Sequence, residues 1–476
     1  MTENFPDEPV EIFSPSLPEK RSPAKQPRGL MAITLCEAWV AYCLYGFGAL
    51  LVLYAADYIL RPDIASTVIG LGPFSQLLQW IFGTTSTSGL AAEISSAYLM
   101  CAFLWPIAAG IIIDLLLGFR NAFIIGMVLI CAGFLLLASS ATFLFALLSL
   151  ILGFGLIRAM LPAQLGQLYD HDDPRRSDGY QIFCLGLQFT GIIAPLAGGL
   201  TEKYYGWGPA FLVLSLGAPL GALFYWLGWK HLPKASSRHQ KGVRIALSRN
   251  DRRALLMIVL FLPALAVSSV PNSQMMSAYE LWGGQHFALS LFGYVLPVSS
   301  LISLDGIASV ATGFMILWLW RVWGRYRRVP EEMAKVVIGG IITPLGPLAL
   351  MAGAYFGPGL HEVNLWWAVA FHFFNDFGFG LSQATGMALV AKLAPGPIRT
   401  SVISFYPFSS FLSQLLAGRL ASLLVAMGSI PFWGLHMAAS IVGAVMFITI
   451  YLAFRDVFRE DASIDVSLKV RQPSLP

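Results

Sequence analysis

Twelve long apolar stretches, separated by short polar segments, occupy most of the 476-residue chain. A helix needs about 20 mostly apolar residues to cross the roughly 30 Å of hydrocarbon in a bilayer. The apolar runs are continuous and lack the alternation of barrel strands, so they predict spanning helices. The predicted spans are 32–60, 92–114, 121–141, 143–163, 180–200, 208–231, 254–278, 292–320, 335–356, 365–393, 400–426 and 432–454.

The composition agrees with this pattern. Hydrophobic residues make up 57% of the chain and charged residues 12%, with a mean hydropathy of +0.69. Soluble domains carry about 25% charged residues, so these values exclude a water-soluble core. We expect an all-α membrane protein.

The ends of the chain and its cysteines add little chemistry. Residues 1–30 are polar and rich in proline, without the apolar core or cleavage site of a secretory signal, and predict a disordered tail. Residues 457–476 predict a second tail. The cysteines all fall inside predicted spans without metal-ligand spacing, so they predict packing residues rather than a disulfide or metal site. They are Cys36, Cys43, Cys101, Cys131 and Cys184.

Lysine and arginine gather in alternate loops, and the loops between them hold few basic residues. By the positive-inside rule the basic loops and both termini lie in the cytoplasm, and we expect the cell (inner) membrane. The net charge of +4 therefore reflects topology and not a nucleic-acid partner. The basic residues are Lys234, Arg238, Lys241, Arg244, Arg249, Arg252 and Arg253 before the seventh span, and Arg321, Arg325, Arg327 and Arg328 after the eighth.

The spans form two sets of six, at 31–231 and 254–456, joined by a basic linker at 232–253. After the second span, Asp114, Gly118 and Arg120 resemble the G-x-x-x-D-(R/K)-x-G-x-(R/K) gate loop of the major facilitator superfamily, with Leu115 in place of the basic residue. The resemblance implies two six-helix halves with a substrate cavity between them near the midplane. The alternative for the loop is an ordinary aspartate and arginine snorkelling at a helix end.

Further motifs follow one another in order along the chain. They are the segments Glu37 to Tyr54, Tyr98 to Pro106, Gly153 to Arg158, Phe183 to Gln188 and Gly386 to Pro395. Each resembles a motif of the proton-dependent oligopeptide transporter (POT) family, and the resemblance implies a proton-coupled peptide transporter.

The chain also departs from the family pattern. Neutral residues replace charges that in the family couple protons and hold peptide termini, so the resemblance favours the fold more than the substrate. The affected positions are Val40, Ala41 and Gly48 in the first span, Pro271 in the seventh and Phe379 in the tenth.

Ionisable residues inside spans are costly and normally face a cavity or one another. Glu37 matches the family's first glutamate and is a candidate proton carrier, although it could instead snorkel to the surface. Arg158 replaces the family's lysine and keeps its charge, so it is a candidate anchor for a substrate carboxylate. A structural ion pair between Arg158 and Glu37 is an equal alternative.

The second half offers three more candidates for proton coupling. Asp305 stands where the family typically has asparagine. Asp376 lies three residues before Phe379, and His372 lies four residues before Asp376, so all three share a helical face. A carboxylate with a histidine one turn away could replace the lost glutamate of the tenth span. The alternative is that these residues join neighbouring helices.

Polar and aromatic residues complete the predicted substrate site. Tyr42, Tyr98 and Gln188 correspond to cavity positions of the family, with Tyr42 standing where the family has phenylalanine. Tyr45 shares a helical stripe with Glu37, and Asn272 adds an amide in the seventh span. Rings and amides suit an amphiphilic solute through stacking and hydrogen bonding. Polar residues of this kind also join membrane helices without touching substrate.

We expect a secondary transporter, not an enzyme, that carries small peptides or peptide-like organic solutes with protons. No cofactor or metal site is expected, because neither an HExxH nor a G-x-S-x-G element occurs. Two alternatives stay open. One is a facilitator of a carboxylate or amphiphilic metabolite without proton coupling, and the other is a receptor built on a transporter fold.

Overall fold

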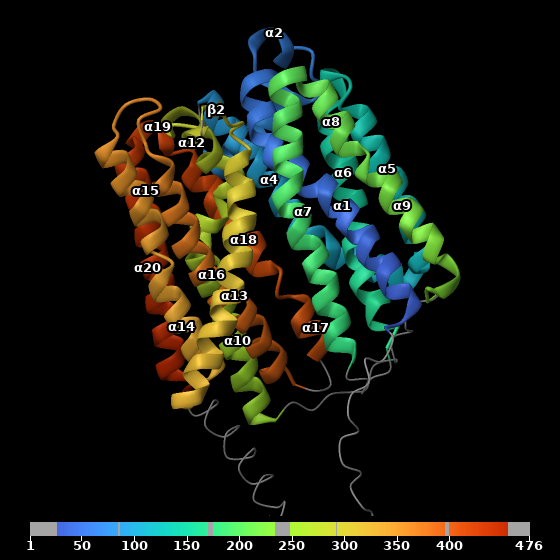
Figure 1. The fold of residues 1–476 in the computed structure, drawn as a ribbon, viewed down its shortest axis with the longest axis vertical. Coiled ribbons are helices and arrows are strands. Elements are labelled where there is room, and N and C mark those ends of the chain that lie inside the picture. Colours follow the sequence, from blue (N-terminus) through green and yellow to red (C-terminus); the bar gives the residue numbers. More distant parts are fainter. Residues whose placement is uncertain are drawn as a thin grey trace, which may run out of the picture.

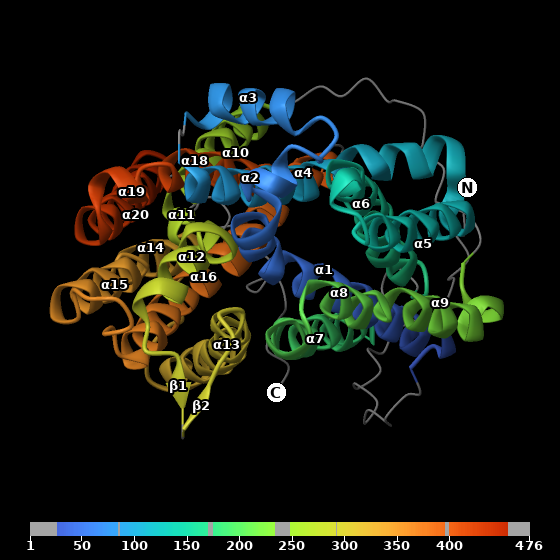
Figure 2. The same ribbon diagram turned by 90° about the horizontal axis from the view of Figure 1, so that it is seen from above.

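The computed structural model describes residues 26–83, 86–169, 175–233, 248–291, 293–395 and 399–455. Its helices run roughly along one axis and gather in two groups that stand side by side (Figure 1). Seen from above, the first and second halves of the chain occupy opposite sides of the molecule (Figure 2). The basic linker at 234–247 and most of both predicted tails lie outside the described residues.

The first half holds the helices up to residue 231. They are α1 (Arg28–Tyr54), η1 (Ala55–Ile59), α2 (Pro62–Ala65), α3 (Leu71–Phe82), α4 (Thr87–Ile112), η2 (Ile113–Leu117), α5 (Gly118–Leu136), η3 (Ser140–Thr142), α6 (Phe143–Gly166), α7 (Arg175–Tyr205), α8 (Trp207–Ser215), α9 (Gly217–Gly228) and η4 (Trp229–His231). Helices α5 and α6 approach closely, since a Cβ on Gly153 would lie 2.8 Å from the carbonyl oxygen of Gly126. Small residues permit this contact between membrane helices.

The second half holds the remaining elements. They are α10 (Arg249–Ser268), α11 (Val270–Ser273), η5 (Met275–Tyr279), α12 (Glu280–His286), β1 (Ser290–Leu291), β2 (Tyr294–Val295), α13 (Ser300–Tyr326), α14 (Glu332–Ile342), α15 (Leu345–Phe356), α16 (Leu365–Leu393), α17 (Arg399–Ser404), α18 (Phe408–Ala421), α19 (Leu424–Met427) and α20 (Ser429–Ala453).

Helix α10 begins at a capping box outside the membrane. The Ser248 hydroxyl accepts a hydrogen bond from the Asp251 backbone, and the Asp251 carboxylate accepts one from the Ser248 backbone. These bonds stabilise the charged carboxylate and lower the pKa of Asp251. The cap fixes the start of the seventh span at the end of the basic linker.

All twelve predicted spans coincide with helical segments. Within the described ranges, eight helical stretches are long and apolar enough to cross a bilayer. One of them, Thr87–Leu136, contains both α4 and α5, which meet at Gly118 (φ 65°). The other three predicted spans correspond to α10–α12, α16 and α17–α19. These segments are interrupted or are less apolar than the eight stretches.

Two predicted boundaries were wrong. The eighth span was expected from 292, but α13 begins at Ser300 and continues to Tyr326. A short hairpin of β1 and β2 precedes it, turning at Gly293 (φ 83°), and short apolar strands resemble helix in their composition. The segment 61–91, expected as a loop, contains α2 and α3. Helix α3 buries Leu71, Leu78 and Phe82, while Trp80 is exposed.

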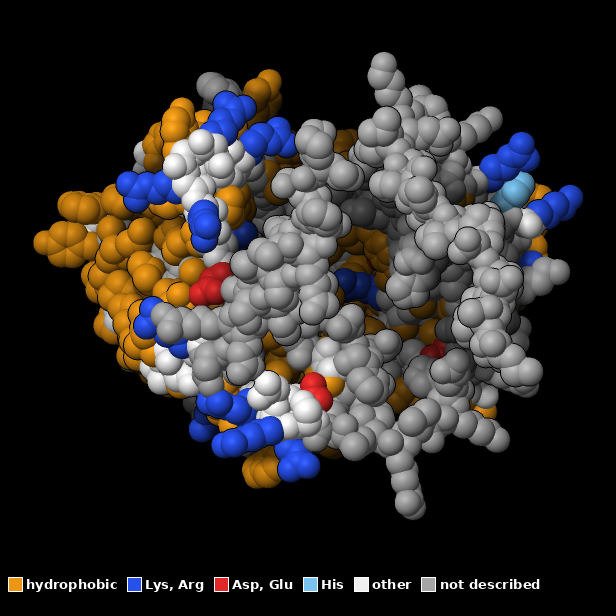
Figure 3. Space-filling model, turned by 90° about the horizontal axis from the view of Figure 1, so that it is seen from below, with side chains coloured by type: hydrophobic (Ala, Val, Ile, Leu, Met, Phe, Trp, Pro, Cys, Tyr) orange, Lys and Arg blue, Asp and Glu red, His pale blue; other side chains and the backbone are white. Residues whose placement is uncertain are grey.

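The two halves meet most closely near the ends of α4 and α18. Helix α4 packs on α18, and α7 packs on α13. Among the described residues, three hydrogen bonds cross between the halves. The Ser95 hydroxyl donates to the Met276 carbonyl (2.5 Å), the Ser299 hydroxyl to the Pro195 carbonyl (2.9 Å), and the Lys203 ammonium to the Val295 carbonyl. The face seen in Figure 3 carries basic side chains, mainly toward its edges.

The seventh span is interrupted at the contact between the halves. Pro271 lies in the first turn of α11, and Met276 and Ser277 have non-helical backbone angles inside η5. Proline lacks a donor for the preceding turn, and irregular backbone is tolerated at membrane depth where protein or a cavity surrounds it. This break places the residues around Asn272 beside the cavity described next.

Candidate functional site

A cavity of about 200 Å³ lies between the two halves at the middle of the bundle. Both halves contribute to its wall, which is mainly apolar but carries one cation and one acid. The lining residues are Leu44, Tyr45, Leu99, Ala102, Phe103 and Arg158 from the first half, and Asn272, Ser273, Met275, Met276, Ile302, Asp305 and Gln414 from the second. A cavity with a few convergent polar groups is the usual form of a small-molecule site.

A larger hollow of about 530 Å³ lies over α2, α3 and the start of α4. Its lining includes hydroxyl, amide and apolar side chains, such as Ser75, Gln76 and Leu90, but no ionisable residue. It therefore lacks a group that could hold a charged solute or a proton, and the central cavity is the better candidate site.

Arg158 supplies the positive charge of the central cavity. It lies on α6 and is partly exposed to the cavity. Its guanidinium has no hydrogen bond or ion pair with any residue that the structure describes. A cation inside a membrane protein requires water or an anion as partner, so this position suits a carboxylate or phosphonate group of a solute.

Glu37 lies on α1, almost completely buried at 3% exposure. Its Oε2 atom has no hydrogen-bond partner among the described residues. The charge of Arg158 acts on Glu37, yet no ion pair within 4 Å joins them in the described structure. The predicted alternative of a structural ion pair is therefore not formed in this conformation, and Glu37 is not at the surface.

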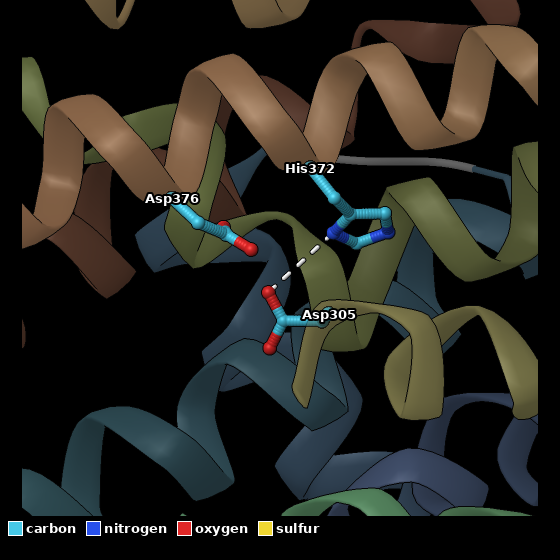
Figure 4. Close-up of side chains that lie close together, drawn as sticks. All are labelled: Asp305, His372 and Asp376. Carbon is cyan, nitrogen blue, oxygen red and sulfur yellow. Dashed lines mark ion pairs between the residues drawn. The ribbon is translucent and has the colours of Figure 1, made fainter. Parts of the chain in front are cut away.

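Three candidate residues of the second half come together beside the cavity (Figure 4). Asp305 comes from α13, while His372 and Asp376 lie one turn apart on α16. The His372 Nδ1 atom is 3.4 Å from Asp305 Oδ1. On its other side, His372 Nε2 is 3.0 Å from the Tyr279 hydroxyl, and the Asn375 amide donates to Asp376 Oδ1 (3.1 Å).

The remaining predicted binding residues divide between the cavity and its surroundings. Tyr45 and Asn272 line the cavity. Tyr98 is buried behind the wall, where its ring packs edge-on against Phe47. Tyr42 packs against α9 near Gly217 and does not line the cavity, so the geometry offers it no direct contact with a solute.

Gln188 is exposed on α7, outside the cavity lining. It lies three residues before Gly191, which faces Gly306 of α13. This places it on the side of α7 that faces the second half.

The predicted gate loop lies at the junction of α4 and α5. Asp114 is exposed in η2, and Gly118 adopts the left-handed φ that ends it. The Arg120 guanidinium lies 4.5 Å from the centre of the Trp229 ring and donates to the Trp229 carbonyl. Arg120 thus holds the loop to the end of the sixth span, within its own half.

Sequence reasoning missed several polar residues. Ser273 and Gln414 line the cavity, and Tyr279 orients His372. Ser273 and Gln414 are polar residues within predicted spans, which was the available signal, whereas Tyr279 lies one residue beyond the predicted end of the seventh span. Glu280 is fully buried, and neither carboxylate oxygen has a hydrogen-bond partner among the described residues.

The cysteines are all free in the described structure, as predicted. Cys36 and Cys43 are buried packing residues. Cys131 and Cys184 are exposed, so the interpretation of all five as packing residues was wrong for these two.

Comparisons with known proteins agree with the fold and the order of the motifs. The chain is 23% identical to the uncharacterized transporter YclF of Bacillus subtilis, over 87% of this chain and 92% of that protein. It is 29% identical to a di-/tripeptide transporter of Lactococcus lactis subsp. lactis, over 49% of this chain and 44% of that protein.

Solved structures of POT transporters share the fold. The structure of the peptide transporter POT in complex with sulfate matches with a TM-score of 0.79 over 92% of this chain and 97% of that chain, at 18% identity. A POT family transporter in complex with 5-aminolevulinic acid matches with a TM-score of 0.75 over 90% of this chain, at 18% identity. The prediction of an all-α major facilitator fold is confirmed.

The sequence comparison extends this likeness beyond the fold. The model of the POT family matches residues 120–250, which include α5, α6 and α7. This segment contains Arg158 of the cavity wall. Together with an uncharacterized transporter aligned over nearly its whole length, these findings show that the chain is similar to POT family transporters in sequence as well as in fold.

Proposed function

We propose that this protein takes up small peptides or peptide-like organic solutes together with protons by alternating access. The observation that carries the proposal is the cavity between the halves, in which Arg158 and Asp305 contribute opposite charges from opposite walls. A zwitterionic solute has a carboxylate for the first and an amino group for the second. The ligands in two similar structures, sulfate and 5-aminolevulinic acid, also carry anionic groups.

Proton coupling follows from acids within the bundle. The proposed proton carriers are Glu37 and Asp376, which are buried, and Asp305, which is partly exposed, with His372 beside the two aspartates. A proton on one of these acids changes its attraction for Arg158 or for His372 and so shifts the balance between the two orientations of the cavity. The solute and the proton are coupled because both act on the same groups.

The halves 31–231 and 254–456 are the proposed moving units, with 232–253 as the connection. The face on which α10 begins carries basic side chains, mainly toward its edges (Figure 3). In this proposal that face is cytoplasmic and both termini lie there. The bacterial relatives support a location in the cell (inner) membrane.

The second candidate is a facilitator for a carboxylate-bearing solute without proton coupling. The departures at Val40, Ala41, Gly48, Pro271 and Phe379 favour it, since these positions lack the family's charges. The backbone supports the departure at Gly48, where a Cβ would lie 3.1 Å from the Met276 sulfur. A long arginine side chain there would displace the second half.

Uptake by purified protein in proteoliposomes separates the two candidates. We expect a labelled dipeptide to accumulate when the outside is acidic and to accumulate much less without a pH gradient. Equal uptake with and without the gradient would favour the second candidate. Saturable binding without any uptake, in vesicles active with a control transporter, would instead indicate a receptor.

A further inference from the structure

The second half contains three potential metal ligands that converge on one point. Asp305, His372 and Asp376 each offer one ligand atom, and these atoms all lie within 4.8 Å of one another. Figure 4 shows the two side chains of α16 directed toward Asp305 of α13. His372 and Asp376 are 0% and 3% exposed, so water does not compete strongly for their polar atoms.

Each of these three side chains has one polar atom without a hydrogen bond among the described residues, and two of these atoms, His372 Nδ1 and Asp305 Oδ1, face each other at 3.4 Å. Asp305 Oδ1, His372 Nδ1 and Asp376 Oδ2 accept or donate no hydrogen bond within the part of the chain that the structure describes. A buried polar atom without a partner is costly and calls for an explanation. Here three such atoms surround the same small volume.

The opposite atoms of two of these side chains are already held. The Tyr279 hydroxyl contacts His372 Nε2 at 3.0 Å, and the Asn375 amide donates to Asp376 Oδ1 at 3.1 Å. Metal-binding histidines almost always have their second nitrogen fixed in this way, because the outer contact sets the ring orientation. Tyr279 and Asn375 therefore act as positioning residues for the three free atoms.

We propose that Asp305, His372 and Asp376 bind a divalent transition-metal ion of the Zn²⁺ class. Two carboxylates neutralise the charge of the ion, and a nitrogen ligand favours Zn²⁺ or Co²⁺ over Mg²⁺ and Ca²⁺, which prefer all-oxygen sites with more ligands. Three protein ligands leave one position open for water or a solute. That position adjoins the substrate cavity, because Asp305 lines both.

The site goes beyond the proposed function and has a consequence for it. An ion bound to Asp305 and to α16 fixes α13 against α16 and occupies the carboxylate that a solute amino group would use. Metal ligands must also be deprotonated, so the ion and a proton exclude each other at these atoms. We therefore expect Zn²⁺ bound at this site to inhibit uptake of the solute.

The test uses purified full-length protein without a histidine tag and does not depend on transport. Co²⁺ is added first, because its visible absorption reports tetrahedral nitrogen and oxygen ligation, and Zn²⁺ is then used to displace it. We expect one ion per chain and a higher unfolding temperature in its presence. Asp376→Asn and His372→Gln should each weaken binding by about 100-fold, and Tyr279→Phe by about tenfold.

The matched control is His436→Gln. His436 is also fully buried in the second half, with its Nδ1 atom 2.8 Å from the Phe432 carbonyl, but it lies on α20 outside the cluster. This variant should keep the full affinity. The unfolding temperature without metal and the elution volume in size-exclusion chromatography show whether each variant is folded. If a variant of a metal ligand does not fold, Tyr279→Phe still tests the proposal, because it changes only a positioning residue. Absence of binding to the wild type, or equal binding by Asp376→Asn and His436→Gln, would overturn the proposal whatever the protein transports.

Discussion

The two walls of the cavity carry charges of opposite sign in different surroundings. Arg158 of α6 stands in the first wall among mostly apolar neighbours, such as Leu99 and Phe103. Across the cavity, Asp305 stands beside His372. The difference suggests that the first wall anchors a solute anion, while the second wall can bind the cationic end of a solute or another cation.

The two walls of the cavity also differ in how regular their backbone is. On the first side, α4 and α6 pass the cavity as continuous helices, each with one internal proline. On the second side, the seventh span divides into α10, α11, η5 and α12, with non-helical angles at Met276 and Ser277. Broken helices supply polar backbone to transporter cavities, so we expect the second wall to rearrange more than the first.

The largest expected effect comes from removing the fixed charge. Arg158→Ala should lower uptake at low substrate concentration by roughly 30- to 150-fold, since a charged hydrogen-bonded pair contributes about 2–3 kcal/mol. Arg158→Lys should recover part of the activity, because it keeps the charge but loses the bidentate geometry. Initial rates in proteoliposomes measure both. If Arg158→Ala transported at the wild-type rate, Arg158 would not anchor the solute, and the proposed difference between the two walls would be wrong.

The next effect concerns the buried acid of the first half. Glu37→Gln imitates the protonated acid permanently, so uptake should lose its dependence on the pH gradient. In the wild type, acidifying the outside should raise uptake, and in the variant the rate should stay flat and about tenfold below the wild-type maximum. Rates at several outside pH values provide the check. A variant that responds to pH like the wild type would assign coupling to the second half alone.

Asp305→Asn sharpens the role of the second wall. The amide cannot attract a solute amino group as a carboxylate does, so the KM for a dipeptide should rise about tenfold. For the same peptide with an acetylated amino end, the change should be small. Uptake competition with both compounds measures the difference, and an equal loss for the two would argue against contact between Asp305 and the amino group.

Gln274→Ala tests a structural contact on the broken span. The Gln274 amide is fully buried and donates to the Ala417 carbonyl of α18 at 2.7 Å. Its loss should reduce stability by about 1–3 kcal/mol, because the carbonyl is left without a partner. The unfolding temperature should fall while the preference among peptides stays unchanged. An altered preference would extend the site beyond the residues that line the cavity.

The smallest effect is expected for Tyr42→Phe. Tyr42 corresponds to a cavity position of the family, but its ring packs on α9 beside Gly217. The change removes one hydroxyl outside the cavity, so KM should change by less than about twofold. Uptake kinetics measure this. A large rise in KM would show that the family alignment locates the site better than the geometry does.

Much of the fold could be predicted because bilayer crossing imposes one strong requirement on every span. Continuous apolar length located all twelve segments, including the eighth, whose start alone was wrong. The hairpin around Gly293 was missed because short apolar strands and helix ends look alike in sequence. The breaks at Met276 and Ser277 were also missed, since neither residue type disrupts a helix by itself.

The site was harder to predict than the fold. Spacing correctly placed His372 and Asp376 on one face, but it could not show that His372 approaches Asp305 from another helix. The family alignment included both Tyr45, which lines the cavity, and Tyr42, which does not. Contacts between distant spans depend on helix rotation, which the period of one helix leaves undetermined.

The most direct test of the account is a binding cycle between Arg158 and the solute carboxylate. Affinities of a dipeptide and of its carboxyl-terminal amide are measured by calorimetry for the wild type and for Arg158→Ala. The account predicts that the amide binds the wild type at least about tenfold more weakly than the free peptide, and that Arg158→Ala binds both equally. An undiminished preference for the free carboxylate in Arg158→Ala would contradict it.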